Sequence, residues 1–319
     1  MPDISVLVAV HNGARFLAEA LDSVWAQTLR PFELIVVDDG STDASAAIAA
    51  GRGATVIRQA NAGTAAAVNT ARDAARGELL ALLDADDRWP QDKLARQVDA
   101  IGDAGLLYSD LSVIDEDGDV LQDSWLDLVW DGAPPEGENC FGALLAANPA
   151  GASSILMRAE LCTPIPPHLR CADWWLAITA ARQGAIAYLP EPRIGYRLHD
   201  SNIGLGTEGA ALGRAHVRRA ATQRHFLATV QAGEATPLEL ALAWNAFERN
   251  VTEALRRLGN PFETIIAVTD ADRERAWVEL ENRSGDPAQA LAAAVRALAA
   301  DPWEPAGHAA LRDAWELVA

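Results

Sequence analysis

The first hundred residues alternate short apolar runs with amphipathic stretches. Residues 4–10 form a mostly apolar run typical of a buried strand, and residues 15–28 place leucine and valine side chains on one helical face. The pattern recurs as expected strands at 33–37, 54–58 and 78–83 and expected helices at 44–50 and 64–75. Strands that alternate with helices predict an α/β fold with a Rossmann-like, mostly parallel sheet and right-handed crossovers.

A different pattern begins after residue 205, where long stretches rich in alanine and leucine have helical spacing. Helices are expected at 209–232, 237–258, 273–283, 287–300 and 304–317. The breaks at Gly285-Asp286-Pro287 and Asp301-Pro302 bracket one helix, and this segment resembles a fragment of a tetratricopeptide-type repeat. The C-terminal region is therefore predicted to be all-helical.

Polar residues follow three of the expected strands. These groups are His11-Asn12-Gly13, Asp38-Asp39-Gly40-Ser41 and Asp84-Ala85-Asp86-Asp87. Ligands of open parallel sheets bind beyond the carboxyl ends of the strands. We therefore expect the three groups to converge on one rim of the sheet and to form the functional site.

Asp84 and Asp86 stand two positions apart, so in an extended chain both carboxylates face the same side. Such a pair is costly unless a cation neutralises it, and Mg²⁺ or Mn²⁺ takes carboxylate, phosphate and water oxygens together. The pair predicts a metal that bridges to a diphosphate. The alternative is that both residues only end the strand and cap a helix near Pro90.

Composition changes this picture in two ways. The chain has 319 residues, more than the ~250 at which single cores stop growing, so a second structural region is expected. It carries 45 acidic and 26 basic residues, a formal net charge of −19, which argues against nucleic-acid partners.

The segment between Arg96 and Arg158 has no basic residue, and acidic residues at 115–119 fall in an expected hairpin turn. Two interpretations of this segment stay open: a solvated, loop-rich surface, or an acceptor site that is unsuited to anionic substrates.

Membrane and export signals are absent from the sequence pattern. The longest uncharged stretch, 140–157, contains Asn148, Pro149 and Gly151, a poor composition for a spanning helix. Residues 1–3 do not begin a signal-peptide pattern, and the three cysteines form no CxxC pair. We expect a cytoplasmic protein without a transmembrane segment, and peripheral attachment at the inner face of the membrane stays open.

Several short motifs stand in a fixed order along the first two thirds of the chain. They lie at 5–12, 21–28, 36–43, 61–63 with Asn69, 83–87, 153–158, 172–174, 188–192 and 196–199. Together they resemble the inverting family 2 glycosyltransferases of the glycosyltransferase-A fold. The resemblance implies a catalytic domain at 1–205, with a nucleotide-sugar half at about 1–100 and an acceptor half at about 101–205, followed by the helical region at 206–319.

The resemblance also implies the reaction and the donor site. A sugar would pass from a nucleotide-diphosphate sugar, with a UDP-sugar favoured, to a hydroxyl of a glycan or glycolipid acceptor. Residues expected to bind the donor are Ala9, Val10, Asn12, Asp38, Asp39, Asn69, Asp84, Ala85 and Arg197. Asp39 would accept a hydrogen bond from the ring N–H of the base. The alternative for Asp38 and Asp39 is turn formation and capping of the helix at Ala44.

The same resemblance implies which residues bind the metal ion and which residue is the general base. Asp86 and His199 would bind Mn²⁺ or Mg²⁺, which stabilises charge on the departing diphosphate as a Lewis acid. Asp173 would be the general base that deprotonates the acceptor hydroxyl. The alternative for Asp173 is an N-cap of a helix that begins at Trp174.

Two departures from the family pattern keep another function open. Ala172 replaces the glutamate that usually precedes the base, and Val68 replaces an arginine that often precedes Asn69. The alternative is a non-catalytic nucleotide-sugar-binding or scaffold protein, whose helical tail mediates oligomer or partner contacts. A dinucleotide-dependent oxidoreductase is disfavoured because no G-x-G-x-x-G follows the first strand.

Overall fold

A computed structural model describes residues 2–130, 132–167, 169, 171–199, 202, 209–231 and 234–258. The chain divides into two compact units: Met1–Cys140 with Asn148–Asp200, and Phe141–Ala147 with Ser201–Ala319. We call them unit 1 and unit 2. The helices expected at 273–283, 287–300 and 304–317 lie outside the described residues.

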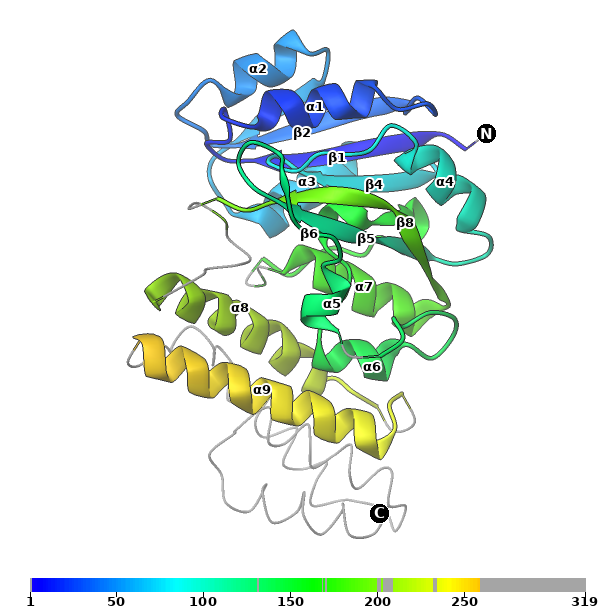
Figure 1. The fold of residues 1–319 in the computed structure, drawn as a ribbon, viewed down its shortest axis with the longest axis vertical. Coiled ribbons are helices and arrows are strands. Elements are labelled where there is room, and N and C mark those ends of the chain that lie inside the picture. Colours follow the sequence, from blue (N-terminus) through cyan, green and yellow to red (C-terminus); the bar gives the residue numbers. More distant parts are fainter. Residues whose placement is uncertain are drawn as a thin grey trace. The chain divides into compact units, whose positions relative to one another are not determined.

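Unit 1 is built on an eight-stranded sheet (Figure 1), in which the order is β3-β2-β1-β4-β7-β5-β6 and β8 also pairs with β5. The strands are β1 (Ile4–Val10), β2 (Glu33–Asp39), β3 (Thr55–Gln59), β4 (Leu79–Asp84), β5 (Leu106–Ile114), β6 (Val120–Gln122), β7 (Leu156–Arg158) and β8 (Ile186–Arg197). Strands β1 to β4 are parallel to one another, β7 is antiparallel to both of its neighbours, and β8 runs parallel to β5. The mostly parallel sheet predicted from the sequence is confirmed.

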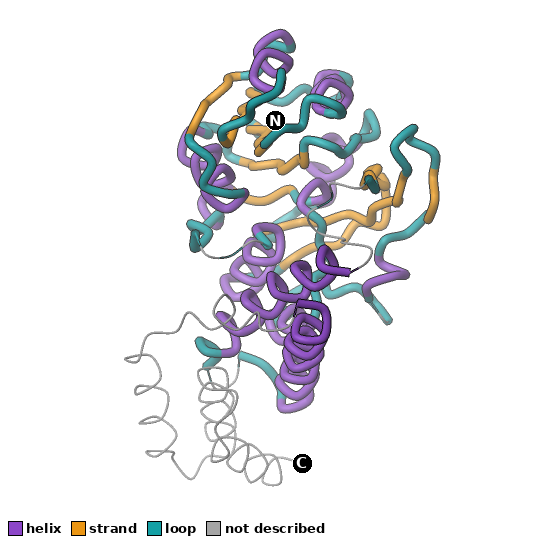
Figure 2. Tube along the Cα trace, turned by 90° about the vertical axis from the view of Figure 1, so that its left-hand side faces the viewer, coloured by secondary structure: helices purple, strands orange, loops and turns teal. Residues whose placement is uncertain are grey.

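Helices cover both sides of this sheet, as Figure 2 shows for the orange strands and purple helices of unit 1. The helices of unit 1 are α1 (Leu17–Trp25), α2 (Ser45–Gly51), α3 (Thr64–Ala74), α4 (Lys93–Ala100), α5 (Leu126–Val129) and α7 (Ala172–Gln183), with short 3₁₀ turns η1 (Ala152–Ser154) and η2 (Ala159–Leu161). A strand covered on both sides needs apolar residues at nearly every position, which explains why the strand sequences read as continuous apolar runs.

The core of unit 1 follows from these patterns. In β1, Val6 and Val8 are fully buried, and Leu17 and Leu21 from α1 are fully buried in the same cluster. Each fully buried side chain of this size contributes about 1.5–3 kcal/mol relative to an exposed one. The rim beyond the strand ends is therefore supported by a rigid sheet.

Unit 2 contains α6 (Phe141–Ala146), α8 (Gly209–Leu227) and α9 (Pro237–Leu258), with α8 and α9 packed side by side (Figure 1). A buried polar chain joins them. Asn250 Nδ2 donates to Gln223 Oε1 at 2.8 Å, and Gln223 Nε2 donates to the carbonyl oxygens of Leu145 and Ala146. These bonds satisfy carbonyl groups at the end of α6 that the helix itself leaves unpaired. Among the described residues, no helix is long and apolar enough to cross a membrane.

Candidate functional site

The strand order places a topological switch point between β1 and β4. From β1 the chain continues to β2 and β3 on one side, whereas β4 lies on the other side of β1. The register aligns Ala9 with Asp84 and Val10 with Asp38, so the three strands end at nearly the same level. Ligands of open α/β sheets bind in the crevice at such a point. The expected convergence of the three polar groups is confirmed.

Asp39 ends β2 and is only 4% exposed. Its Oδ1 accepts hydrogen bonds from Gln59 Nε2 at 2.8 Å and the Ala62 N–H at 2.9 Å, and its Oδ2 accepts one from the Gly63 N–H at 2.8 Å. Gly63 has φ 89°, a conformation that favours glycine. Since a carboxylate has about four acceptor sites, these bonds leave capacity for one further donor.

The neighbouring Asp38 has a different environment. Its Oδ1 accepts from the Ser41 N–H at 2.9 Å and its Oδ2 from Arg58 Nε at 3.0 Å, while its side chain is fully buried. Burial opposes ionisation, but the hydrogen bonds from Ser41 and Arg58 leave the pKa of Asp38 below its ordinary value. Asp38 therefore stabilises the turn after β2 but does not cap α2, whose N-cap Ala44 receives no side-chain hydrogen bond, and a role of Asp38 in donor binding stays a prediction.

Asn12 links the end of β1 to that turn. Its backbone has φ 54°, in the left-handed region that asparagine tolerates better than most residues. The Asn12 N–H donates to Ser41 Oγ at 2.9 Å, and Asn12 Oδ1 accepts from the Thr42 N–H at 2.8 Å. The two loops at the rim therefore support each other.

Asp86 and His199 lie together, as the family resemblance implied. His199 Nε2 is 2.8 Å from Asp86 Oδ2. The Phe16 ring packs against the imidazole with ring centroids 5.1 Å apart, and it also lies 4.8 Å from the Arg197 guanidinium. The pair joins the loop after β4 to the end of β8.

Further carboxyl groups lie close to this pair. Burial, followed by the charges of Asp86 and Asp173, raises the pKa of Asp84 to about 8. Burial, followed by Asp86 and Asp84, raises the pKa of Asp87 well above its ordinary value. Ser153 Oγ donates to Asp87 Oδ2 and accepts from the Asp84 N–H. A site in which carboxylates resist ionisation favours a bound cation.

Asp173 lies in the first turn of α7, which begins at Ala172 after the N-cap residue Cys171. The helix therefore starts two residues before the position assumed in the capping alternative. Asp173 Oδ2 accepts a hydrogen bond from Asn148 Nδ2 at 3.0 Å, and Oδ1 accepts one from the Trp174 N–H at 2.8 Å. Its charge acts on Asp84, so the expected base and the acidic loop after β4 lie at the same site.

The family model for glycosyl transferase family 2 matches residues 5–159. The chain belongs to this family. An uncharacterized protein of Mycobacterium tuberculosis is 33% identical in an alignment 213 residues long that covers 63% of this chain and 60% of that protein. An uncharacterized glycosyltransferase of Nostoc is 33% identical over 216 residues, 62% of this chain and 66% of the relative. The match thus spans 60 to 66% of the length of these relatives.

Two solved structures share the fold. Staphylococcus aureus TarS 1–349 in complex with UDP-GlcNAc has a TM-score of 0.57 at 15% identity, over 99% of this chain and 90% of that one. The mannosyltransferase PcManGT from Pyrobaculum calidifontis, in complex with GDP-Man and Mn²⁺, has a TM-score of 0.55 at 21% identity, over 99% and 86%. The glycosyltransferase-A fold expected from the motifs is confirmed.

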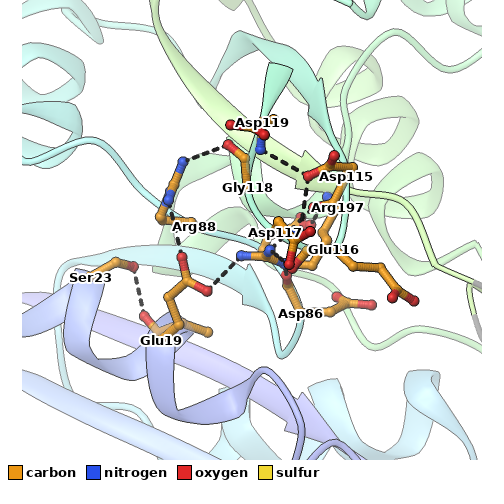
Figure 3. A network of polar contacts seen from close by, with 12 residues as sticks. Glu19, Ser23, Asp86, Arg88, Asp115, Glu116, Asp117, Gly118, Asp119 and Arg197 are labelled. Carbon is orange, nitrogen blue, oxygen red and sulfur yellow. Dashed lines mark hydrogen bonds and ion pairs between the residues drawn. The ribbon is translucent and has the colours of Figure 1, made fainter. Parts of the chain in front are cut away.

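In this family 2 protein, the Arg197 side chain is 1% exposed and forms a clamp (Figure 3). Its Nε donates to the Asp86 carbonyl at 2.9 Å, and its Nη1 donates to the carbonyls of Asp115 at 3.2 Å and Glu116 at 2.8 Å. Its Nη2 lies 2.7 Å from Glu19 Oε2. These donors are directed at protein acceptors, so the Arg197 side chain supports the loop around Asp86. Contact between Arg197 and a phosphate stays a prediction.

A second arginine extends the clamp. Arg88 Nη1 donates to Glu19 Oε1 at 3.1 Å, and its Nη2 donates to the Gly118 carbonyl at 3.3 Å (Figure 3). Residues 115–119 form the β5–β6 turn expected from the sequence, closed by the Asp115 N–H to Asp119 carbonyl bond. The acidic turn is thus fixed through Glu19 on α1.

The remaining donor candidates occupy different positions. Ala9 and Val10 are in β1, and Ala85 follows β4 at the rim. Asn69 lies in α3, where its Nδ2 donates to the Ile165 carbonyl and its Oδ1 accepts from the Ile165 N–H, both at 2.8 Å. The Asn69 amide therefore anchors the segment before α7, and its role in donor binding stays a prediction.

Three groups at the site had no role assigned to them from the sequence. They are Glu19, Asn148 and Ser153, which contact Arg197, Asp173 and the acidic loop after β4 respectively. Each reaches its partner through the fold and not through sequence spacing. The described residues contain no group of three or more His, Cys, Asp or Glu side chains that could hold a metal ion by themselves.

Proposed function

We propose that the protein is a metal-assisted, inverting glycosyltransferase that moves a sugar from a UDP-sugar to a hydroxyl of a glycan or glycolipid. The observation that carries the proposal is the Asp86–His199 pair, with 2.8 Å between carboxylate oxygen and imidazole nitrogen, at the switch-point end of the sheet. Family membership and the donor complexes of structural neighbours support a nucleotide-sugar donor.

The residues present fit a divalent cation such as Mn²⁺ or Mg²⁺. Asp86 and His199 would supply an oxygen and a nitrogen ligand, and a cation would favour ionisation of Asp84, whose pKa is raised by burial and by the nearby carboxylates Asp86 and Asp173. Because two side chains do not complete a coordination shell, diphosphate and water oxygens would provide the rest. When bound, the metal supplies Lewis-acid stabilisation of the leaving diphosphate.

The base of the nucleotide would bind at the ends of β1 and β2. Asp39 has three donors from the protein and capacity for a fourth, which the ring N–H of uracil would supply. A base that lacks this N–H would leave a buried acceptor without its partner, at a cost of ~1–3 kcal/mol. This contact supports UDP over a cytidine nucleotide, whose ring offers no such donor.

Asp173 would carry the proton transfer. As the acceptor oxygen attacks the anomeric carbon, its proton passes to the Asp173 carboxylate, and the bond from that carbon to the diphosphate oxygen breaks with its electrons on the diphosphate. Attack opposite the leaving group inverts the configuration. Base catalysis of this kind commonly supplies ~10²–10⁴-fold.

The same proposal assigns different roles to the two regions of the chain. Residues 1–205 would carry the chemistry, and the helical region at 206–319 would provide contacts to a partner or to another copy of the chain. A cytoplasmic location with peripheral attachment to the membrane would suit a lipid-linked acceptor.

Calorimetric titration of the protein with UDP, in Mn²⁺, in Mg²⁺ and in chelator, tests the donor site. We expect binding that requires metal and that weakens in Asp86→Ala. Asp99→Ala is a matched control because Asp99 is an exposed carboxylate on α4. Failure to bind UDP, dTDP or GDP with any metal would refute the active-transferase proposal and favour the scaffold function.

Release of UDP from UDP-sugars tests the catalytic step. We expect Asp173→Asn to abolish turnover while UDP binding remains nearly unchanged, because the side chain keeps its size and loses its basicity. Transfer at the wild-type rate in this variant would show that another group is the base.

A further inference from the structure

We propose that Asn148 is the positioning residue for the Asp173 carboxylate. The inference rests on the proposed function, because it names the residue that orients the proposed general base. Asn148 Nδ2 donates a hydrogen bond to Asp173 Oδ2 at 3.0 Å. The two residues are 25 positions apart, and Asn148 lies in the loop between α6 and η1.

The orientation of the Asn148 amide is defined by its other contact. Asn148 Oδ1 accepts a hydrogen bond from the Ala150 N–H at 3.2 Å. A backbone N–H can only donate, so the amide oxygen must face Ala150 and the amide nitrogen must face Asp173. A flipped amide would lose both hydrogen bonds, so Asn148 is committed to donating to the carboxylate.

The two oxygens of Asp173 are held from two directions. Oδ1 accepts from the Trp174 N–H within α7, and Oδ2 accepts from Asn148 in a loop that precedes the helix. One donor alone would allow the carboxylate to rotate about its χ2 torsion, which is broad for aspartate. Two donors on different segments fix the plane of the carboxylate.

Asn148 also acts on the charge of the base. The charge of Asp173 interacts with Asp84 at the end of β4 and with Tyr196 on β8. An ionised Asp84 disfavours a second negative charge at Asp173, whereas a hydrogen bond donated to a carboxylate favours its ionised form. The position of Asp173 in the first turn of α7 acts in the same direction as the Asn148 amide.

Residue 172 explains why a donor from outside the helix matters here. The residue before Asp173 is Ala172, which is 6% exposed and has no polar side-chain group. Ala172 therefore cannot position the Asp173 carboxylate by a side-chain hydrogen bond. Asn148 supplies a polar contact to the base from a different segment.

Asn148→Asp is the most informative variant. An aspartate keeps the acceptor for the Ala150 N–H, and it replaces the donor to Asp173 by a negatively charged oxygen. Asn245→Asp is the matched control, because Asn245 is exposed on α9 and the change in charge is the same. Asn148→Ala is a second variant that removes the donor without adding charge.

The measurement is a ¹³C NMR titration of aspartate carboxyl groups, in which loss of a signal in Asp173→Asn assigns Asp173. We expect the titration midpoint of this signal to move to higher pH in Asn148→Asp by on the order of one pH unit, and by less in Asn148→Ala. We expect Asn245→Asp to leave it in place. A midpoint that moves no further in Asn148→Asp than in Asn245→Asp overturns the proposal.

Release of UDP from UDP-N-acetylglucosamine and UDP-glucose, with water as acceptor, separates the two proposals. If the Asp173 midpoint moves in Asn148→Asp but Asp173→Asn releases UDP at the wild-type rate, Asp173 is not the base and the positioning contact stands. If the midpoint does not move in Asn148→Asp but Asp173→Asn no longer releases UDP, only the role of Asn148 is refuted.

Discussion

His199 Nε2 and Asp86 Oδ2 lie 2.8 Å apart although the two residues are 113 positions apart in the sequence. Asp86 follows β4 and His199 follows β8, and these strands are not neighbours in the sheet. The loop after β4 is drawn to the end of β8 by the Asp87 carboxylate, which accepts from the Arg197 N–H at 2.9 Å. The fold thus brings a carboxylate oxygen and an imidazole nitrogen together from both halves of the sheet.

Substitution at either end of this pair should weaken metal-dependent nucleotide binding. We expect Asp86→Asn and His199→Gln each to reduce the Mn²⁺-dependent affinity for UDP by about 10-fold or more. Because both residues would bind one ion, the double variant should lose less than the sum of the two free-energy changes. Calorimetric titration of all four proteins measures this coupling. Full additivity, or unchanged affinity in both single variants, would contradict a shared ion.

The rim of the sheet was predictable because it depends on local patterns. Apolar runs that end in Asp39 and Asp84 define parallel strands, and parallel strands in neighbouring positions end at one edge. The ends of most elements were also close to those expected, and α9 coincides with the predicted helix at 237–258. Local signals therefore locate the acidic groups at the rim.

The supporting contacts were not predictable, because they depend on how distant segments meet. Glu19 reaches Arg197 across 178 positions, and the amide of Asn148 is oriented by a loop without regular periodicity. From the sequence, Arg197 was expected near a phosphate, which stays a prediction, and the structure adds that Arg197 Nε, Nη1 and Nη2 bond to backbone carbonyls and to Glu19. Only the three-dimensional arrangement distinguishes such roles.

Lys93 provides a test of stability away from the rim. It is fully buried on α4, its Nζ has no hydrogen-bond partner among the described residues, and it lies 3.8 Å from the Trp89 ring centroid. Burying a polar group without a hydrogen bond costs about 1–3 kcal/mol. We expect Lys93→Met, which keeps a similar length, to increase the free energy of unfolding by about that amount, measured by urea denaturation.

The same variant should change how stability depends on pH. Burial lowers the pKa of Lys93 well below its ordinary value. Between the folded and unfolded pKa values the unfolded chain binds a proton that the native protein does not, so wild-type stability rises with pH in that window. The gain from Lys93→Met should therefore be larger at about pH 6 than at about pH 9. An equal gain at both values would contradict a neutral amine in the native state.

The Arg197 clamp should depend on the shape of the side chain as well as on its charge. Lysine keeps the charge but lacks the planar fork that reaches Asp86, Glu116 and Glu19 together. We expect Arg197→Lys to lower the free energy of unfolding by about 2–4 kcal/mol, since buried carbonyls lose charged donors. Glu19→Gln should cost less, about 1 kcal/mol, because the Glu19 side chain is 44% exposed and glutamine still accepts hydrogen bonds.

Arg15→Lys is the control for this pair of variants. Arg15 also bonds to the β5–β6 turn, through Glu116, but its side chain is 63% exposed, so solvent screens the ion pair and its contribution to stability should be small. Chemical denaturation should therefore rank the three variants with Arg197→Lys most destabilised and Arg15→Lys least. If Arg197→Lys were no more destabilising than Arg15→Lys, the turn would be held by its own backbone bonds and not by the buried guanidinium.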